Sequence, residues 1–234
     1  MGKSENRASR HALNNEASGV RFDLQAIAHA GDLAVYGYEF LYRGQVRPSS
    51  ADAWTSVDQG VLRYLASEVQ VTGKPCFINL SHESVLAIQE SSFAAACKRN
   101  DLRFEMSEAI AEGELFDLVC DKVNHLCGRG MQFAIDDFGA GLDGSRRIYA
   151  LDSVSAIKVD RNLLVCAASR PQAARMLAAS VSSWRSAGIQ TVAEGVESPE
   201  LLDFARDVGF DLVQGWHVDT LAPSKRAVIP RSFF

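Results

Sequence analysis

The feature that most constrains the fold is a regular alternation of short apolar runs with amphipathic segments. Eight runs have the composition of β-strands, at residues 22–28, 33–42, 76–80, 102–106, 131–135, 155–159, 189–193 and 211–214. Between the last six runs, apolar residues recur at three- and four-residue steps, as in helices that bury one face, and the first of these helices is expected at residues 83–98. A similar apolar stripe at residues 54–69 predicts an amphipathic helix between the second and third runs. Repeated β-α units predict parallel strands covered by helices, and eight strands in a chain of 234 residues suit a (β/α)₈ barrel better than an open sheet.

The first two runs break this regularity. Only residues 29–32 separate them, and Gly31 among these can adopt the positive φ of a tight turn. So short a link predicts an antiparallel pair, because parallel neighbours need a crossover of a dozen or more residues. We therefore expect an α/β, TIM-like barrel with one antiparallel strand from an N-terminal hairpin. Residues 1–20, rich in charge, Ser and Asn, are expected to form a flexible arm before a single barrel domain at 21–234.

Charge and composition exclude several classes of protein. The chain has 24 Lys+Arg against 29 Asp+Glu, a formal net charge of −5, which disfavours a protein that coats nucleic acid polymers or membranes. No run approaches the roughly 20 apolar residues of a membrane span, and the polar first 20 residues lack the apolar centre of a signal peptide, so we expect a cytoplasmic protein. Five cysteines without C-x-x-C spacing indicate reduced thiols rather than a disulfide frame or a zinc site.

Polar residues stand where six successive strands end, at the barrel edge that carries active sites. They are Asn79, Glu105, the pair Asp136 and Asp137, Lys158, Glu194 and Gln214. Any one of them could be polar only because the ends of strands and the loops are exposed to solvent, but six strand ends in succession indicate a functional site.

Glu39 lies inside the aromatic run 36–42, where an unpaired buried carboxylate would be costly, so we expect a cation beside it. With the carboxylates and amide at the strand ends it forms an all-oxygen set, which suits Mg²⁺ or Mn²⁺ and not zinc. The adjacent Asp136 and Asp137 could serve two ions, one of them shared. Two ions about 4 Å apart stabilise the attacking and leaving oxygens of displacement at phosphorus, which predicts phosphodiester hydrolysis.

Seven short motifs follow in order along residues 25–214. They are Glu39-Phe40-Leu41, Ile78-Asn79-Leu80-Ser81, Phe104-Glu105-Met106-Ser107-Glu108, Asp136-Asp137-Phe138-Gly139-Ala140-Gly141, Ile157-Lys158-Val159-Asp160, Ala193-Glu194-Gly195-Val196-Glu197 and Gln214-Gly215-Trp216. This series resembles the EAL-domain phosphodiesterases, which hydrolyse the bacterial second messenger cyclic di-GMP to linear pGpG. The resemblance implies a hydrolase specific for a cyclic guanylate, with two Mg²⁺ or Mn²⁺ ions in its site.

The resemblance also implies a role for each polar residue. The metal ligands would be Glu39, Asn79, Glu105, Asp136 and Asp137. Lys158 and Glu194 would orient and deprotonate the attacking water, with Glu194 as the general base. The substrate contacts would be Leu41, Arg43, Gln214 and Gln25, with Arg43 on a phosphate. The braces of the loop after the aspartate pair would be Glu108 and Glu197.

Plainer interpretations stay open for some of these residues. Arg43 and Lys158 could be ordinary ion-pair partners, Lys158 with Asp160, and the tryptophans Trp54 and Trp216 are expected in the core.

Three differences from the family bear on activity. Phe40 replaces a small Ala, only 40 positions separate Glu39 from Asn79, and residues 141–147 depart from the loop that links metal binding to dimerisation in the family. These differences motivate an alternative function, a catalytically silent EAL module that binds cyclic di-GMP or a protein partner. Whether the chain forms a homodimer stays open as well.

Overall fold

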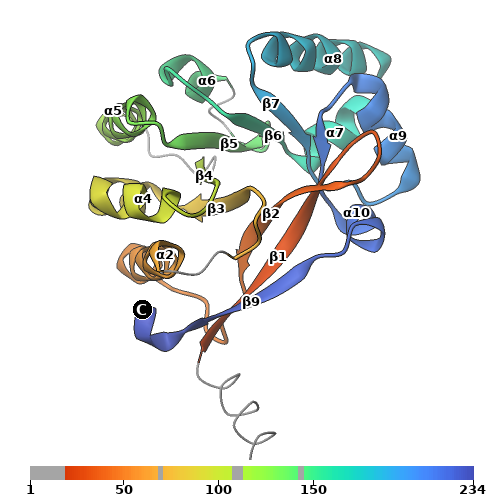
Figure 1. The fold of residues 1–234 in the computed structure, drawn as a ribbon. Helices are drawn as coiled ribbons and strands as arrows, with labels where there is room; N and C mark the ends of the chain where they lie inside the picture. Colours follow the sequence, from red (N-terminus) through yellow and green to blue (C-terminus); the bar gives the residue numbers. More distant parts are fainter. Residues whose placement is uncertain (1–18, 68–70, 107–112, 142–144) are drawn as a thin grey trace, which may run out of the picture.

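The computed structural model describes residues 19–67, 71–106, 113–141 and 145–234, and in it eight strands form a closed barrel with helices on the outside (Figure 1). The strands are β1 Gly19–His29, β2 Val35–Tyr42, β3 Cys76–Leu80, β4 Leu102–Met106, β5 Gln132–Phe138, β6 Ala156–Val159, β7 Gln190–Ala193 and β8 Leu212–Val213, with β9 Lys225–Pro230 outside the barrel. The helices are α2 Ala51–Ala66, α3 His82–Ala87, α4 Glu90–Cys97, α5 Glu114–Gly128, α6 Arg146–Ala150, α7 Arg161–Ala168, α8 Pro171–Ser186, α9 Pro199–Val208 and α10 Trp216–Leu221, and a 3₁₀ turn covers Arg231–Phe233.

The pairing of the strands confirms the predicted barrel with one reversed strand. Strands β2 to β8 follow one another in parallel, and β1 closes the ring by pairing antiparallel with both β2 and β8. Gln25 of β1 stands opposite Glu39 of β2 in this register. Gln25, in the middle of β1, therefore lies at the same end of the barrel as Glu39 and the carboxyl ends of the parallel strands, although β1 runs in the opposite direction.

The hairpin between β1 and β2 differs in detail from the prediction. The backbone N–H of His29 donates to the carbonyl of Ala34 at 2.9 Å, so the turn is tight. The residue with positive φ is Leu33, at 60°, and not Gly31. The expectation for Gly31 was therefore wrong, although the reversal itself is as predicted.

One predicted helix is divided in two. The apolar pattern at residues 83–98 predicted a single helix, but α3 ends at Ala87 and α4 begins at Glu90. Ile88 between them has extended backbone (ψ 133°) and is buried, since its side chain is 2% exposed. The chain thus leaves the helical path to pack Ile88 into the core, which the periodicity of the sequence does not reveal.

The ninth strand was not predicted, and its first residues, Lys225 and Arg226, are charged. It pairs with residues Gly19–Leu24 of β1, so the two ends of the described chain run side by side (Figure 1). Beyond it, the ring of Phe233 packs edge-on against Tyr64 of α2. The C-terminal segment therefore ties β1 to α2. Of the arm predicted at 1–20, residues 19 and 20 belong to β1, and residues 1–18 lie outside the described part.

Inside the barrel the side chains form two layers. The lower layer is an apolar cluster packed with Tyr36, and its members are Ile27, Phe77, Ala134, Ala156, Val192 and Leu212. Side chains that are two residues apart on a strand point to the same face. The residues two positions after Phe77, Ala134, Ala156, Val192 and Leu212 are therefore also directed inward, and they are Asn79, Asp136, Lys158, Glu194 and Gln214. An apolar floor thus supports a polar ring at the barrel mouth.

Candidate active site

The polar ring opens into a cavity of about 940 Å³ at the carboxyl ends of the parallel strands. Its lining includes Glu39, Asn79, Asp136, Asp137 and Glu194. The structure thus brings together residues from β2, β3, β5 and the end of β7 that are widely separated in the sequence.

Lys158 is the centre of this ring. Its side chain is 1% exposed, and its Nζ lies 3.1 Å from Glu39, 2.7 Å from Glu105, 2.7 Å from Asp136 and 2.8 Å from Glu194, each distance to a carboxylate oxygen. Lys158 thus supplies one positive charge beside Glu39, whose carboxylate is not buried unpaired. Asp160 is not its partner, because the Asp160 carboxylate caps α7 by accepting the N–H of Asn162.

The ion pairs fix the charges of Lys158 and Glu39. Burial alone would lower the pKa of Lys158, but the surrounding carboxylates, Asp136 first, raise it well above its usual value. Burial would raise the pKa of Glu39, yet Lys158 and hydrogen bonds from Gln214 and Asn79 lower it. Both groups are therefore charged at neutral pH.

For three other carboxyl groups, Glu105, Glu194 and Asp137, burial outweighs the effect of Lys158 on the pKa. Burial, reinforced by the charge of Glu39, raises the pKa of Glu105 well above its usual value. Burial also raises the pKa of Glu194 to about 8 and that of Asp137 to about 6, in both cases with a contribution from Asp136. One ammonium is too little charge for the cluster, so without further cations some of these carboxyl groups hold protons.

The donor set fits divalent cations. Glu39, Glu105, Asp136, Asp137 and Glu194 would carry five negative charges against one positive charge on Lys158, a difference of four that two divalent ions would match. Glu105 is fully buried, and Lys158 contacts its Oε1, but no described residue donates a hydrogen bond to its Oε2. Oxygens of Asp136, Asp137 and Glu194 also lie within 4.8 Å of one another, close enough to share an ion.

The two adjacent aspartates both line the cavity because the strand is irregular there. Neighbouring residues of a regular strand point to opposite faces. Here the β5–β6 register shifts between Ile135 and Phe138, and Asp137 adopts a positive φ of 52°. Gly139 follows with a φ of 95°, and a Cβ at this position would lie 2.5 Å from Leu163, so a glycine is required.

The predicted substrate contacts lie at the same mouth. Leu41 and Arg43 line the cavity, and Gln214 donates to Glu39 at 2.6 Å and to Gln25 at 3.0 Å. Gln25 in turn donates to Asp219 at 2.9 Å. Arg43 forms an ion pair with Asp23 at 2.9 Å, as its plainer interpretation allowed.

The remaining predictions concern the loop braces Glu108 and Glu197 and the tryptophans Trp54 and Trp216. Glu197 pairs with Arg161 at 2.7 Å, whereas Glu108 lies outside the described residues. Trp216 is 74% exposed, so its expected place in the core was wrong, while Trp54 is half-buried and lines the cavity.

Asp58 is a residue of the cavity that the sequence reasoning missed. It is 7% exposed, and its carboxylate accepts the hydroxyl of Ser84 at 2.5 Å. Burial raises the pKa of Asp58 to about 6. The sequence could have indicated Asp58, because it lies inside the apolar stripe of residues 54–69. A carboxylate on the buried face of a helix is costly unless it has a partner or a function.

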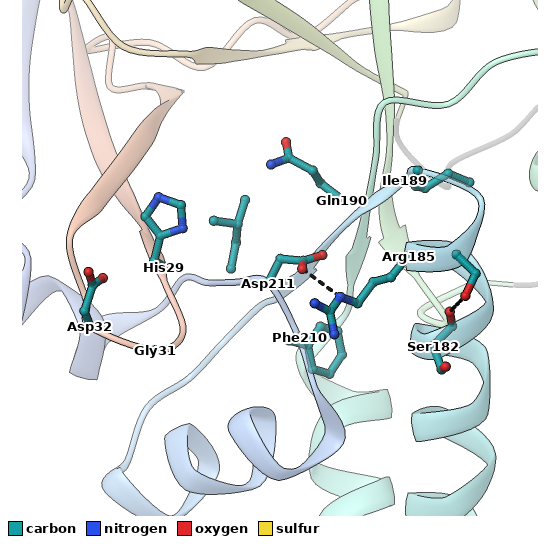
Figure 2. A pocket seen from close by; sticks show the side chains of 12 residues that line it. His29, Gly31, Asp32, Ser182, Arg185, Ile189, Gln190, Phe210 and Asp211 are labelled. Atoms are coloured by element: carbon teal, nitrogen blue, oxygen red, sulfur yellow. Dashed lines mark hydrogen bonds and ion pairs between the residues drawn. The ribbon is translucent and has the colours of Figure 1, made fainter.

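A second cavity, of about 1040 Å³, lies at the opposite end of the barrel (Figure 2). His29 at the end of β1, Gln190 at the start of β7 and Asp211 before β8 contribute to it. Arg185 and Asp211 form an ion pair in the wall of this cavity, with an Nε to Oδ1 distance of 2.8 Å.

Comparison with known proteins identifies the family. The model of the EAL domain matches residues 57–220, most of the chain. The chain is a member of the EAL domain family. No helix in the described ranges is long and apolar enough to cross a membrane.

Relatives and solved structures agree with this assignment. The chain is 31% identical over 96 residues to the probable cyclic di-GMP phosphodiesterase PdeG of Escherichia coli, covering 41% of this chain and 19% of PdeG. A manganese and cyclic di-GMP complex of BlrP1 from Klebsiella pneumoniae superposes with a TM-score of 0.69 at 26% identity, covering 90% of this chain and 56% of BlrP1. A standalone EAL protein of Vibrio cholerae shares the fold, with a TM-score of 0.67 at 22% identity and coverage of 85% and 90%. The chain spans less than a third of the length of the curated relatives that it matches.

Proposed function

We propose that this EAL domain is a metal-dependent phosphodiesterase that hydrolyses cyclic di-GMP to linear pGpG. The observation that carries the proposal is the surplus of carboxylates around Lys158, which four of them share, while Oε2 of the buried Glu105 has no hydrogen-bond donor among the described residues. A relative named as a probable cyclic di-GMP phosphodiesterase, and a neighbour solved with manganese and cyclic di-GMP, support the choice of substrate and of the class of ion.

Five residues would hold two Mg²⁺ or Mn²⁺ ions, and these are Glu39, Asn79, Glu105, Asp136 and Asp137. Bound there, the ions would polarise a phosphate ester and make a bound water more acidic. They would also neutralise the acidic mouth, which would otherwise repel an anionic substrate.

Glu194 and Lys158 would act on the attacking water. The Glu194 carboxylate would accept a proton from the water as its oxygen bonds to phosphorus, while the P–O3′ bond breaks and the released ribose oxygen takes up a proton. Addition of one water thus opens the ring and leaves a 5′-phosphate on the linear dinucleotide. Lys158, held beside Glu194 at 2.8 Å, would keep that carboxylate in place and orient the water.

The remaining predicted contacts would position the dinucleotide. Arg43 would exchange its partner Asp23 for a phosphate of the substrate, a stronger acceptor for a guanidinium, and Leu41 would pack beside it. Gln214 and Gln25 would complete the pocket, with Glu108 and Glu197 bracing the loop after the aspartate pair. Cytoplasmic location and a homodimer stay predictions.

The test is release of pGpG from cyclic di-GMP by the purified chain, with Mg²⁺, Mn²⁺, Ca²⁺ or a chelator. Turnover with Mg²⁺ and Mn²⁺, its loss on chelation and inhibition by the larger Ca²⁺ are expected. Absence of pGpG with both Mg²⁺ and Mn²⁺ would overturn the proposal. If calorimetry then detected bound cyclic di-GMP, the catalytically silent module would be the better description.

A further inference from the structure

Arg147 of α6 is completely buried behind the strands of the site, and the mechanism above gives it no role. Its side chain is 0% exposed. Its Nη1 donates to the carbonyl of Met106 at 2.6 Å, and its Nη2 donates to the carbonyl of Asp136 at 3.0 Å. Met106 follows Glu105 on β4, and Asp136 is on β5. One guanidinium therefore joins the two strands that carry Glu105 and the aspartate pair.

The contact lies at the last described pair of the β4–β5 ladder. Parallel pairing of β4 with β5 extends to Met106 opposite Ile135, and β5 becomes irregular in the next two residues. Among the described residues, no further ladder pair fixes the separation of the two strands beyond this point. A guanidinium suits such a place because its donors lie in one rigid plane and can hold two carbonyls at a set spacing.

The same contact controls the orientation of the aspartate pair. The carbonyl of Asp136 belongs to the peptide unit that joins it to Asp137, and rotation of this unit would redirect both carboxylates. Asp137 has a φ of 52°, a conformation that is uncommon for non-glycine residues, although Asp adopts it more readily than most, and that surrounding contacts help to enforce. A charge-assisted hydrogen bond from Arg147 to this peptide unit is such an enforcing contact.

We propose that Arg147 is a positioning residue of the metal centre, which sets the distance and orientation of Glu105 relative to Asp136 and Asp137. The inference rests on the metal-ligand roles proposed above for these three residues. Arg147 acts through the backbone and does not touch the ions or the substrate.

Two substitutions and one control test this role. Arg147→Met keeps much of the side-chain volume but removes the hydrogen bonds to the carbonyls of Met106 and Asp136, and Arg147→Lys keeps the charge without the planar pair of donors. The control is Arg146→Met on the same helix, where the native guanidinium lies on the ring of Phe116 and the side chain is 48% exposed. Mn²⁺ affinity is measured by calorimetry for each variant, together with its melting temperature without metal.

Arg147→Met is expected to weaken Mn²⁺ binding by about 10- to 100-fold, as loss of a ligand-orienting contact does in other metal sites. Arg147→Lys should lose less, and Arg146→Met should bind as the wild type does. A residue that only stabilises the fold would instead lower the melting temperature and leave the affinity unchanged. That result for folded Arg147→Met overturns the inference.

The design separates this inference from the proposed function. If the wild type binds no Mn²⁺, the proposed metal site fails and the inference fails with it. If the wild type binds Mn²⁺ and Arg147→Met binds it equally, only the role of Arg147 is overturned. Should Arg147→Met not fold, folded Arg147→Lys with wild-type affinity is the overturning result, and a severalfold loss is the supporting one.

Discussion

The two ends of the barrel both carry a cavity lined by charged residues, but their charges are organised differently. At the carboxyl ends of the strands, one buried ammonium serves four carboxylates, and Asp137 adds a fifth acid to the lining. At the opposite end Arg185 pairs with Asp211 (Figure 2). Asp211 also accepts the N–H and the hydroxyl of Thr191.

Cavity size does not distinguish these two ends. The cavity with paired charges is the larger, at about 1040 Å³ against about 940 Å³. The mouth differs in having an unbalanced set of buried acids. Such a set destabilises the folded state, so the stability of the fold does not explain it. Such a set indicates a ligand of opposite charge, whereas a partly exposed, balanced pair such as Arg185–Asp211 needs no ligand to explain it.

The strongest test of this contrast is Glu105→Gln at the mouth. Gln keeps the shape of the side chain but cannot bind a cation as an anionic ligand, so we expect pGpG formation to fall by about three to four orders of magnitude. Without metal the variant should be at least as stable as the wild type. The reason is that burial raises the pKa of Glu105, so the uncharged Gln resembles its favoured protonated form. Turnover assays and urea unfolding measure the two effects.

The matched variant at the other end is Asp211→Asn, which should keep wild-type turnover. Loss of activity in both variants would mean that the two ends are coupled. Wild-type activity in Glu105→Gln would remove Glu105 from the proposed metal ligands.

Removal of the central cation tests the balance of charge directly. Lys158→Met should lower the free energy of unfolding without metal by about 3–5 kcal/mol, because the charged Glu39 and the three buried acids beside it lose their shared partner. Addition of Mn²⁺ should recover part of this stability, since the ions neutralise the same groups. Urea unfolding with and without Mn²⁺ measures both quantities. A loss below 1 kcal/mol would show that the carboxylates do not depend on Lys158.

The polar ring was predictable because it follows a local pattern. On several strands an apolar residue of the barrel floor is followed two positions later by a polar one, as in Phe77 and Asn79 or Ala156 and Lys158. Both the period of the strand and the edge at which active sites lie are general properties of barrels. The sequence therefore predicted the fold and placed these residues at one mouth without any contact being known.

The parts that were missed depend on distant contacts. Arg146 and Arg147 are adjacent and chemically identical, yet only the second is buried, because α6 presents it to carbonyls of β4 and β5. Strand β9 forms only by pairing with β1, almost the whole chain away in sequence. Neither neighbour preference nor periodicity contains this information, since both features arise from the way the elements pack together.

Asp58 is a further buried acid of the mouth, and its partners are neutral: its carboxylate accepts hydrogen bonds from Ser84 and Ser81. Its pKa is about 6 in the folded protein against a usual value of 3.8, so the folded state holds the proton more tightly than the unfolded state does. Stability from this group is therefore complete below about pH 4 and is lost as the pH rises through 6, by up to about 3 kcal/mol. Asp58→Asn lacks this dependence.

The measurement is the free energy of unfolding of Asp58→Asn minus that of the wild type. This difference should grow by about 2–3 kcal/mol between pH 4 and pH 7. A difference that stays constant between pH 4 and pH 7 would show that Asp58 is not held as a buried carboxyl group.

The smallest effect is expected in the larger cavity. Arg185→Gln removes a pair whose side chains are 51% and 26% exposed, so water already competes for both charges. Asp211 keeps its hydrogen bonds from Thr191 in this variant, and the free energy of unfolding should fall by only about 0.2–1 kcal/mol. Raising the salt concentration should shrink even this difference, because partly exposed pairs are screened. A salt-independent loss of 3 kcal/mol or more, which is the size expected for Lys158→Met, would place a second set of strained charges at this end and would end the contrast between the two cavities.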